Sequence, residues 1–297
     1  MNLRKQLRGV GVAIVTPFTA EGGIDYKALS RLIDFLIENG TRYIVTQGTT
    51  GETPTLSPAE KRELLVFTYS QVNGRVPVVV GVGGNDTRSV CRQLEELPLE
   101  KATAVLSASP YYNKPSQEGI FQHYRALAAA SPCPLILYNV PGRTGRNMEP
   151  ETTLRLARDV KNIAGIKEAG NSVQQCMHLL RDRPEDFLVV SGDDDLVLAE
   201  LAGGIDGVIS VVANCYPGKF NRLVDAGLNG DFETARHINF ELMDAYRLLF
   251  IENNPAGAKA FLHEMGFIEN QLRLPLVPLS AGLQEEVRAY LRRFPAP

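Results

Sequence analysis

The stretch Asn162-Ile163-Ala164-Gly165-Ile166-Lys167-Glu168-Ala169 places a lysine at the end of a short apolar run. An earlier run, Pro134-Leu135-Ile136-Leu137-Tyr138-Asn139-Val140, places a tyrosine near its own end. Short runs rich in Ile, Leu and Val are typical of strands buried on both faces of a parallel sheet. If the two strands are neighbours, an amine and a phenol meet at the same edge of that sheet.

Apolar runs of this kind alternate with helical patterns along most of the chain. Residues 25–40 show an apolar period close to 3.6, which Asn39-Gly40 ends as a helix C-terminus would. Ser57-Pro58-Ala59-Glu60 has the N-cap serine, first-turn proline and following glutamate of a helix start, and Ser116 and Glu149 begin weaker starts. The predicted strands are residues 12–18, 43–47, 76–82, 102–108, 134–140, 162–168, 187–191 and 207–213.

Eight strands separated by helices predict an α/β fold, the closed (β/α)8 TIM barrel. The alternative is an open doubly wound sheet, which carries a glycine-rich loop after its first strand. Thr16-Pro17-Phe18 stands at that position, so the barrel is favoured. Further helical patterns follow at residues 219–228, 231–249, 255–265 and 284–293. We therefore expect a barrel with the active site over residues 1–225 and a C-terminal helical bundle over residues 226–297.

Composition and charge argue against several classes of function. The 297 residues are 44% hydrophobic and 22% charged, and 31 basic against 34 acidic residues leave a net charge of −3. This balance offers no electrostatic footprint for nucleic acid. No apolar run approaches the ~20 residues of a membrane span, and Gln6-Leu7-Arg8 stands where a signal peptide would be apolar. We expect a cytoplasmic protein without a nucleic-acid or membrane partner.

The cysteines are spread too widely for a disulfide framework or a metal site of the CxxC type. We interpret them as free buried thiols in a reducing compartment. They are Cys91, Cys133, Cys176 and Cys215.

The C-terminal ends of the strands are the candidate positions for the site, because barrels of this kind build their active sites there. Lys167 lies at the end of the sixth strand, where an amine that loses hydration favours its neutral form and can attack a ketone. Tyr138 lies at the end of the fifth, and its phenol can move the protons that such chemistry requires. Structural alternatives are a rim lysine paired with Glu168 and a core tyrosine with a satisfied hydroxyl.

Other strand ends carry groups that suit an anionic substrate. Gly48-Thr49-Thr50-Gly51-Glu52 can present successive N–H groups to a carboxylate, or can form an ordinary glycine-rich turn. Arg143 follows a Pro-Gly turn and can clamp a carboxylate, or can remain a solvated loop arginine.

Two more strand ends have weaker signals. The paired tyrosines of Ser109-Pro110-Tyr111-Tyr112-Asn113-Lys114-Pro115 suit an interface or a proton path, with loop packing as the alternative. The acids of Ser191-Gly192-Asp193-Asp194-Asp195 have no histidine beside them, so a solvated or supporting role is favoured over a metal site.

Taken together, these motifs resemble the pyruvate-dependent Schiff-base lyases and synthases, and within them the dihydrodipicolinate synthases. The resemblance covers residues 8–290. Its specific parts are Gly48-Thr49-Thr50-Gly51-Glu52, Pro110-Tyr111-Tyr112-Asn113-Lys114-Pro115, Tyr138-Asn139-Val140-Pro141-Gly142-Arg143-Thr144-Gly145 and Gly165-Ile166-Lys167-Glu168.

The resemblance implies a reaction and its catalytic groups. Lys167 would form an imine with pyruvate, and the resulting enamine would attack L-aspartate-4-semialdehyde to give 4-hydroxy-tetrahydrodipicolinate, in diaminopimelate and lysine biosynthesis. Tyr138, Thr49 and Tyr112 would form a hydroxyl relay, with Tyr112 supplied by a neighbouring subunit. The chemistry needs no metal and no cofactor beyond the covalently bound pyruvate. A homotetramer built as a dimer of dimers is the common assembly of the family.

The resemblance also implies binding roles. The Thr50 hydroxyl and nearby N–H groups would hold the pyruvate carboxylate, and Arg143 would bind the carboxylate of the aldehyde. Gly192 and Ile209 would line the pocket through backbone atoms. Arg143 separates this reading from lyases for N-acetylneuraminate or 2-keto-3-deoxy sugar acids, whose polyol substrates need no cation there. A catalytically silent, pyruvate-binding regulator is the alternative from another class.

Two departures from the family pattern lead to further expectations. Gly170-Asn171 follows Ala169 without the additional residue that the family often has, so the loop after the sixth strand is expected to differ. Pro58, Lys61 and Ser89 replace the histidine and acids of lysine-inhibited members, although Asn85 and Tyr111 match. We therefore predict weak or absent feedback inhibition by L-lysine.

Overall fold

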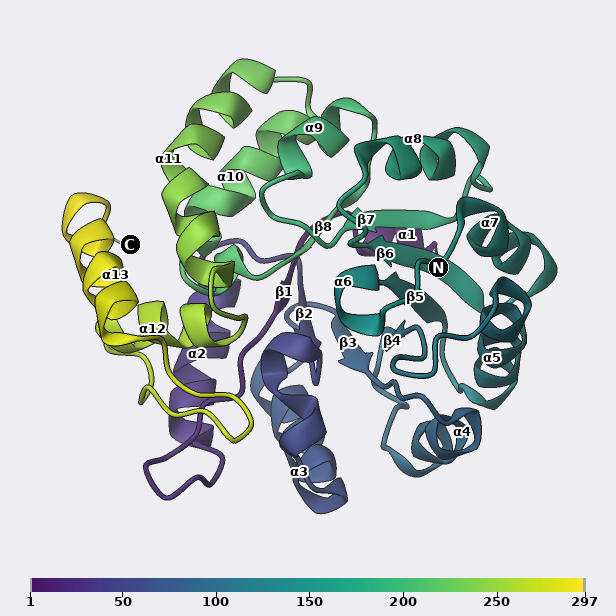
Figure 1. Ribbon diagram of the computed structural model, residues 1–297, viewed down its shortest axis with the longest axis horizontal. Helices are drawn as coiled ribbons and strands as arrows, with labels where there is room; N and C mark the ends of the chain where they lie inside the picture. Colours follow the sequence, from purple (N-terminus) through teal and green to yellow (C-terminus); the bar gives the residue numbers. More distant parts are fainter. Residues whose placement is uncertain (1, 296–297) are drawn as a thin grey trace.

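Parallel strands close into a barrel in the computed structural model of the protein, which describes residues 2–295 (Figure 1). Each strand pairs with the next in chain order, and β8 pairs with β1 to complete the ring. The predicted (β/α)8 barrel is therefore confirmed. The strands are β1 Gly9–Ala13, β2 Tyr43–Thr46, β3 Val78–Gly81, β4 Ala104–Ala108, β5 Leu135–Asn139, β6 Ile163–Glu168, β7 Leu188–Ser191 and β8 Gly207–Ser210.

The predicted bounds are wrong for the first strand and too long for the last. β1 begins at Gly9 and includes Gly11, although glycine is a poor strand former. Glycine is required at position 11, because a Cβ there would lie 2.0 Å from the Tyr43 ring. β8 ends at Ser210, and the residues after it turn into the 3₁₀ helix η3, Val212–Asn214. The other strands lie within the predicted ranges.

Helices surround the barrel and continue beyond it (Figure 1). Ser57 and Glu60 form the predicted capping box, and Ser116 caps the helix that begins at Gln117. The helices are α1 Leu3–Gln6, α2 Tyr26–Glu38, α3 Pro58–Val72, α4 Thr87–Glu96, α5 Gln117–Ala130, α6 Pro141–Thr144, α7 Pro150–Asp159, α8 Val173–Asp182, α9 Val197–Ala202, α10 Pro217–Leu228, α11 Phe232–Phe250, α12 Ala256–Glu264 and α13 Ala281–Arg293.

Alternation along the strands creates two hydrophobic clusters. Leu135 and Leu137 of β5 belong to the large cluster between the sheet and the helices. Ile136 and Tyr138 belong to a second cluster, which fills the barrel interior. The same period of two turns Lys167 of β6 to the inner side, since its neighbour Ile166 belongs to the outer cluster.

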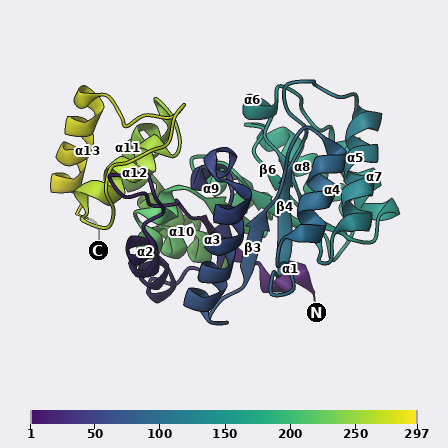
Figure 2. The same cartoon turned by 90° about the horizontal axis from the view of Figure 1, so that it is seen from below.

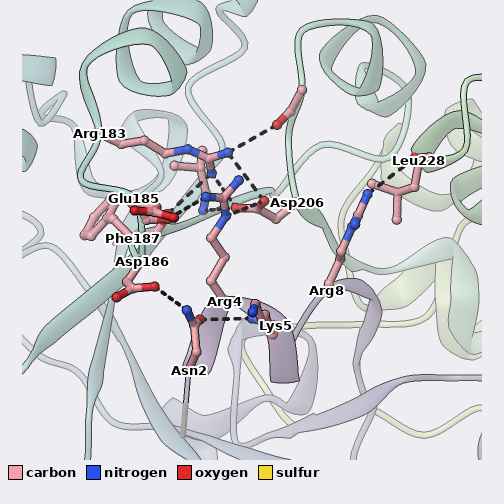
Figure 3. A network of polar contacts seen from close by, with 12 residues as sticks. Asn2, Arg4, Lys5, Arg8, Arg183, Glu185, Asp186, Phe187, Asp206 and Leu228 are labelled. Atoms are coloured by element: carbon pink, nitrogen blue, oxygen red, sulfur yellow. Dashed lines mark hydrogen bonds and ion pairs between the residues drawn. The ribbon is translucent and has the colours of Figure 1, made fainter.

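The short helix α1 closes the N-terminal end of the barrel. Leu3 and Leu7 pack into the interior cluster, and Arg4 donates through Nε to Asp206 Oδ1 at 2.9 Å. Arg183 binds the same carboxylate, which also accepts the Val189 N–H at 3.0 Å (Figure 3). Figure 2 shows α1 at the end of the barrel opposite α6. This closure leaves the other end for the site.

The helices α11 to α13 lie together against one side of the barrel (Figures 1 and 2). The predicted boundary between the barrel and the C-terminal helical bundle, at position 225, falls inside helix α10. The division of the chain into these two parts stays a prediction. Within residues 2–295, no helix is long and apolar enough to cross a membrane.

All four cysteines are free thiols. Cys133, Cys176 and Cys215 are buried as predicted, whereas the prediction is wrong for Cys91, which is half-buried. Its helix α4 turns Val90 and Leu94 inward instead.

Candidate active site

A cavity of about 850 Å³ opens at the C-terminal end of the barrel. The ends of β2, β5, β6 and β7 form one wall, as the barrel prediction requires. Side chains between residues 239 and 254, from α11 and the loop after it, form the other. The sequence patterns had not indicated this second wall, because α11 reads as an ordinary amphipathic helix.

Tyr138 and Lys167 meet in this cavity, as the apolar runs at residues 134–140 and 162–169 predicted. They are register partners in β5 and β6, and Lys167 Nζ lies 4.5 Å from the centre of the Tyr138 ring. Lys167 is 5% exposed, so its amine is largely removed from bulk water but still borders the cavity. A lysine in this position can act as a nucleophile toward a bound ketone.

Behind these two residues, an amide network joins β5 and β6 on the outer side of the sheet. Asn139 donates through Nδ2 to Glu168 Oε1 at 2.8 Å, and Gln175 donates through Nε2 to Glu168 Oε2 at 3.1 Å. Burial raises the pKa of Glu168 to about 7. The lysine is therefore not paired with Glu168 as a rim residue, since the two side chains leave opposite faces of the strand.

The loop after β2 brings Thr49 and Thr50 to the cavity. It forms the 3₁₀ helix η1, Thr49–Gly51, and Glu52 follows with a left-handed φ of 53°. Such backbone is unfavourable for a residue other than glycine and persists only where its surroundings hold it.

A buried ion pair holds this loop in place. Lys259 Nζ of α12 lies 2.5 Å from Glu52 Oε1, and both side chains are fully buried. Glu52 Oε2 also accepts the Arg273 N–H at 3.0 Å. Burial lowers the pKa of Lys259 to about 8, although Glu52 attracts its proton. Glu52 therefore fixes the loop, and the chain beyond the barrel supplies its partners.

Arg143 lines the same cavity from α6, the short helix after β5. Its Nη2 donates to the main-chain oxygen of Asn254 at 3.3 Å. Asn254 is buried, and its Nδ2 donates to Thr50 Oγ1 at 3.0 Å. Sequence reasoning missed Asn254, because it lies in a loop after α11 and belongs to none of the strand-end motifs.

Gly192 at the end of β7 lies against Lys167. A Cβ at this position would stand 2.8 Å from Lys167 Cε and 2.5 Å from Ala169 Cβ, so only glycine leaves the lysine undisturbed. Ile209 is buried in the interior cluster, and Val211 is the residue near that strand end that borders the cavity.

The three acids after Gly192 differ in their exposure. Asp194 is buried and accepts the N–H groups of Val211 and Val212 at 2.9 and 2.8 Å, while burial raises its pKa to about 6. Asp193 lines the cavity, and its pKa is also raised by burial. Only Asp195 is exposed. Across residues 2–295, no group of three or more His, Cys, Asp or Glu side chains is placed to hold a metal ion.

Tyr112 stands apart from the other candidates. It is 88% exposed, it adopts a left-handed φ of 72°, and it does not line the cavity of its own chain. The structure thus brings Lys167, Tyr138, Thr49, Thr50, Arg143 and Gly192 together, whereas neither Tyr112 nor Ile209 lines this cavity.

Comparisons with known proteins identify the family of the chain. The family model described as the dihydrodipicolinate synthetase family matches residues 6–294. The 4-hydroxy-tetrahydrodipicolinate synthase of Parabacteroides distasonis is 49% identical over 288 residues, 97% of each chain. The crystal structure of dihydrodipicolinate synthase from Thermotoga maritima superposes with a TM-score of 0.94 at 42% identity, over 97% of this chain and 98% of that one. The structure of a monomeric dihydrodipicolinate synthase variant superposes with a TM-score of 0.95 at 41% identity, over 98% of each chain. The chain therefore belongs to the dihydrodipicolinate synthetase family.

Proposed function

We propose that this protein condenses pyruvate with L-aspartate-4-semialdehyde to give 4-hydroxy-tetrahydrodipicolinate and water, in diaminopimelate and lysine biosynthesis. The observation that carries the proposal is the meeting of Lys167 and Tyr138 in a cavity that Arg143 also lines. The curated relatives at 48–49% identity are 4-hydroxy-tetrahydrodipicolinate synthases.

The proposed chemistry starts at Lys167. Its neutral amine attacks the keto carbon of pyruvate, water leaves, and the resulting imine withdraws electrons from the methyl group. That methyl loses a proton to become an enamine, which attacks the aldehyde carbon of the second substrate. The amino group of the bound product then displaces Lys167 and closes the ring, so the enzyme is regenerated without a separate cofactor.

The proton transfers are proposed for the Tyr138 phenol and the Thr49 hydroxyl. The Tyr138 ring lies 4.5 Å from the Lys167 amine on the neighbouring strand, and Thr49 borders the same cavity. General acid–base groups of this kind act through hydrogen bonds to the reacting atoms.

Two anion sites are proposed for the two substrates. The Thr50 hydroxyl and adjacent N–H groups hold the carboxylate of pyruvate, with Gly192 and Ile209 contributing backbone atoms. Arg143 holds the carboxylate of the aldehyde, since a guanidinium binds a carboxylate at two points. A sugar acid would present hydroxyl groups there and would leave the cation unpaired.

The third relay hydroxyl is proposed to come from Tyr112 of a second copy of this chain. Its exposure supports that role, because the hydroxyl is free to enter a neighbouring cavity. We accordingly propose a cytoplasmic homotetramer built as a dimer of dimers. Light scattering reports the mass of the assembly.

Subunit mixing tests the shared site. Tyr112→Phe and Lys167→Ala chains are each expected to be nearly inactive alone. Random mixing pairs them in half of the dimers, each with one intact site, so about a quarter of wild-type activity should return. No recovery after proven subunit exchange would show that Tyr112 does not act in the neighbouring site.

The activity itself is tested by pyruvate-dependent turnover of L-aspartate-4-semialdehyde, coupled to a reductase that consumes NADPH. Lys167→Ala should abolish turnover, and Arg143→Ala should raise the KM for the aldehyde much more than the KM for pyruvate. Arg146→Ala is the matched control, since this exposed arginine of the same segment does not line the cavity. If wild type is inactive but borohydride with pyruvate still labels Lys167, the aldehyde partner is wrong and a sugar-acid lyase takes its place. No label would indicate the silent regulator.

A further inference from the structure

One residue of the loop between α11 and α12 connects the two proposed anion sites. Asn254 is 5% exposed and borders the cavity. Its side chain donates to the hydroxyl oxygen of Thr50, and its main-chain oxygen accepts a hydrogen bond from Arg143. A single loop position therefore touches the group proposed for pyruvate and the group proposed for the aldehyde.

The direction of the first hydrogen bond decides what Thr50 can do. Asn254 Nδ2 is the donor and Thr50 Oγ1 the acceptor. An oxygen that already accepts keeps its own O–H proton for another partner. A carboxylate can only accept, so it needs that proton.

The neighbouring threonines show the contrast. Thr16, Thr53 and Thr55 each donate their hydroxyl proton to a main-chain oxygen of residues 48–52. Within residues 2–295, the Thr50 hydroxyl donates no such bond and acts only as an acceptor. Its proton is thus free to serve a ligand in the cavity that Thr50 lines.

Further contacts tie the two loops together. Lys259 lies in α12, five positions after Asn254. Its amine pairs with Glu52, and both side chains are fully buried. Arg273 holds the second oxygen of Glu52 through its N–H. These contacts hold the start of α12 and the loop after β2 beside each other, so the bond from Asn254 is supported by buried contacts on the same two segments.

We propose that Asn254 is a positioning residue that turns the Thr50 hydroxyl into a hydrogen-bond donor for the carboxylate of pyruvate. This inference rests on the proposed function and deepens it. The Asn254 side chain acts on pyruvate through Thr50, whereas its main-chain oxygen orients Arg143. Side-chain substitutions therefore separate the two effects.

The test is borohydride trapping of pyruvate on the enzyme, measured as the pyruvate concentration that gives half-maximal labelling. Thr50→Val should raise this concentration about 10- to 100-fold, the range for a lost hydrogen bond to a charged group. Asn254→Ala should raise it about 3- to 10-fold, because the hydroxyl is no longer oriented. Asn254→Asp is nearly isosteric, but its carboxylate would accept the Thr50 proton. This variant should weaken the binding of pyruvate at least as much as Thr50→Val does.

A double-mutant cycle identifies the route of the effect. In the Thr50→Val background, Asn254→Ala should change the half-maximal concentration by less than about 2-fold. In steady-state assays, the KM for the aldehyde should stay at the wild-type value in all Asn254 variants, because the bond to Arg143 uses the main chain. Asn221→Ala is the matched control: it removes an equally buried asparagine outside the cavity.

Three outcomes would overturn the inference. One is trapping by Asn254→Ala and Asn254→Asp at the wild-type pyruvate concentration. Another is an equal rise in the half-maximal pyruvate concentration when Asn254→Ala is made in wild type and in Thr50→Val. Wild-type protein that traps no pyruvate would overturn the proposed function as well, so the two failures are distinguishable.

Discussion

Replacing Lys259 with methionine should destabilise the protein far more than a typical change of a lysine. Lys259 and Glu52 are both fully buried, with Nζ and Oε1 2.5 Å apart. Methionine fills a similar volume but leaves the Glu52 carboxylate buried, with the Arg273 N–H as its remaining partner. Breaking one side of a buried ion pair costs about 3–5 kcal/mol of the free energy of unfolding.

A half-exposed ion pair between α10 and α11 offers a matched control. Lys219 Nζ lies 2.7 Å from Glu241 Oε2, but both side chains are 31% exposed. Solvent screens such a pair, so Lys219→Met should cost about 0–1 kcal/mol. The double variant Glu52→Gln with Lys259→Met removes both charges and should recover part of the stability lost in Lys259→Met alone.

Urea denaturation followed by circular dichroism measures these differences, and borohydride trapping of pyruvate reports the state of the loop that carries Thr49 and Thr50. We expect Lys259→Met to lose both stability and affinity for pyruvate, because Glu52 holds that loop. A loss no larger than that of Lys219→Met would refute the reasoning, and so would unchanged trapping in a clearly destabilised protein.

Three further predictions concern other parts of the molecule. Gly192→Ala should slow imine formation at least tenfold, since its Cβ would stand 2.8 Å from Lys167 Cε; single-turnover trapping measures the rate, and a wild-type rate would contradict the contact. Burial raises the pKa of Glu200 to about 7, so the folded state keeps this carboxyl protonated at pH values where the unfolded state has lost the proton. The free energy of unfolding therefore falls as pH rises from about 4.5 to 7. Glu200→Gln should therefore stabilise the protein by ~3 kcal/mol at pH 8 but by less than ~1 kcal/mol at pH 5, and an equal gain at both would exclude this cause. L-Lysine at physiological concentration should leave turnover nearly unchanged, as Pro58, Lys61 and Ser89 lack the groups expected to bind it; strong inhibition would disprove this.

Local patterns in the chain predicted many of the residues that line the cavity. The apolar run that ends at Lys167 and the run that ends near Tyr138 predicted neighbouring strands, and the register in the barrel pairs these two residues. Parallel strands present their C-terminal ends at one face, so the loops at residues 48–52 and 141–144 were expected there too. The first strand was misplaced because glycines are poor strand formers, and the Tyr43 ring that Gly11 accommodates is visible only in the folded structure.

The sequence by itself determined the alternation of strands and helices, the helix starts at Ser57 and Ser116, and the strand-end motifs, because these depend on residues close together in the chain. Only the tertiary structure decided that Asn254 donates to Thr50 across 204 positions and that Lys259 neutralises Glu52. Such contacts follow no period or spacing. They exist because the closed barrel and the helices after it bring distant loops to the same cavity, where burial makes each polar group require a partner.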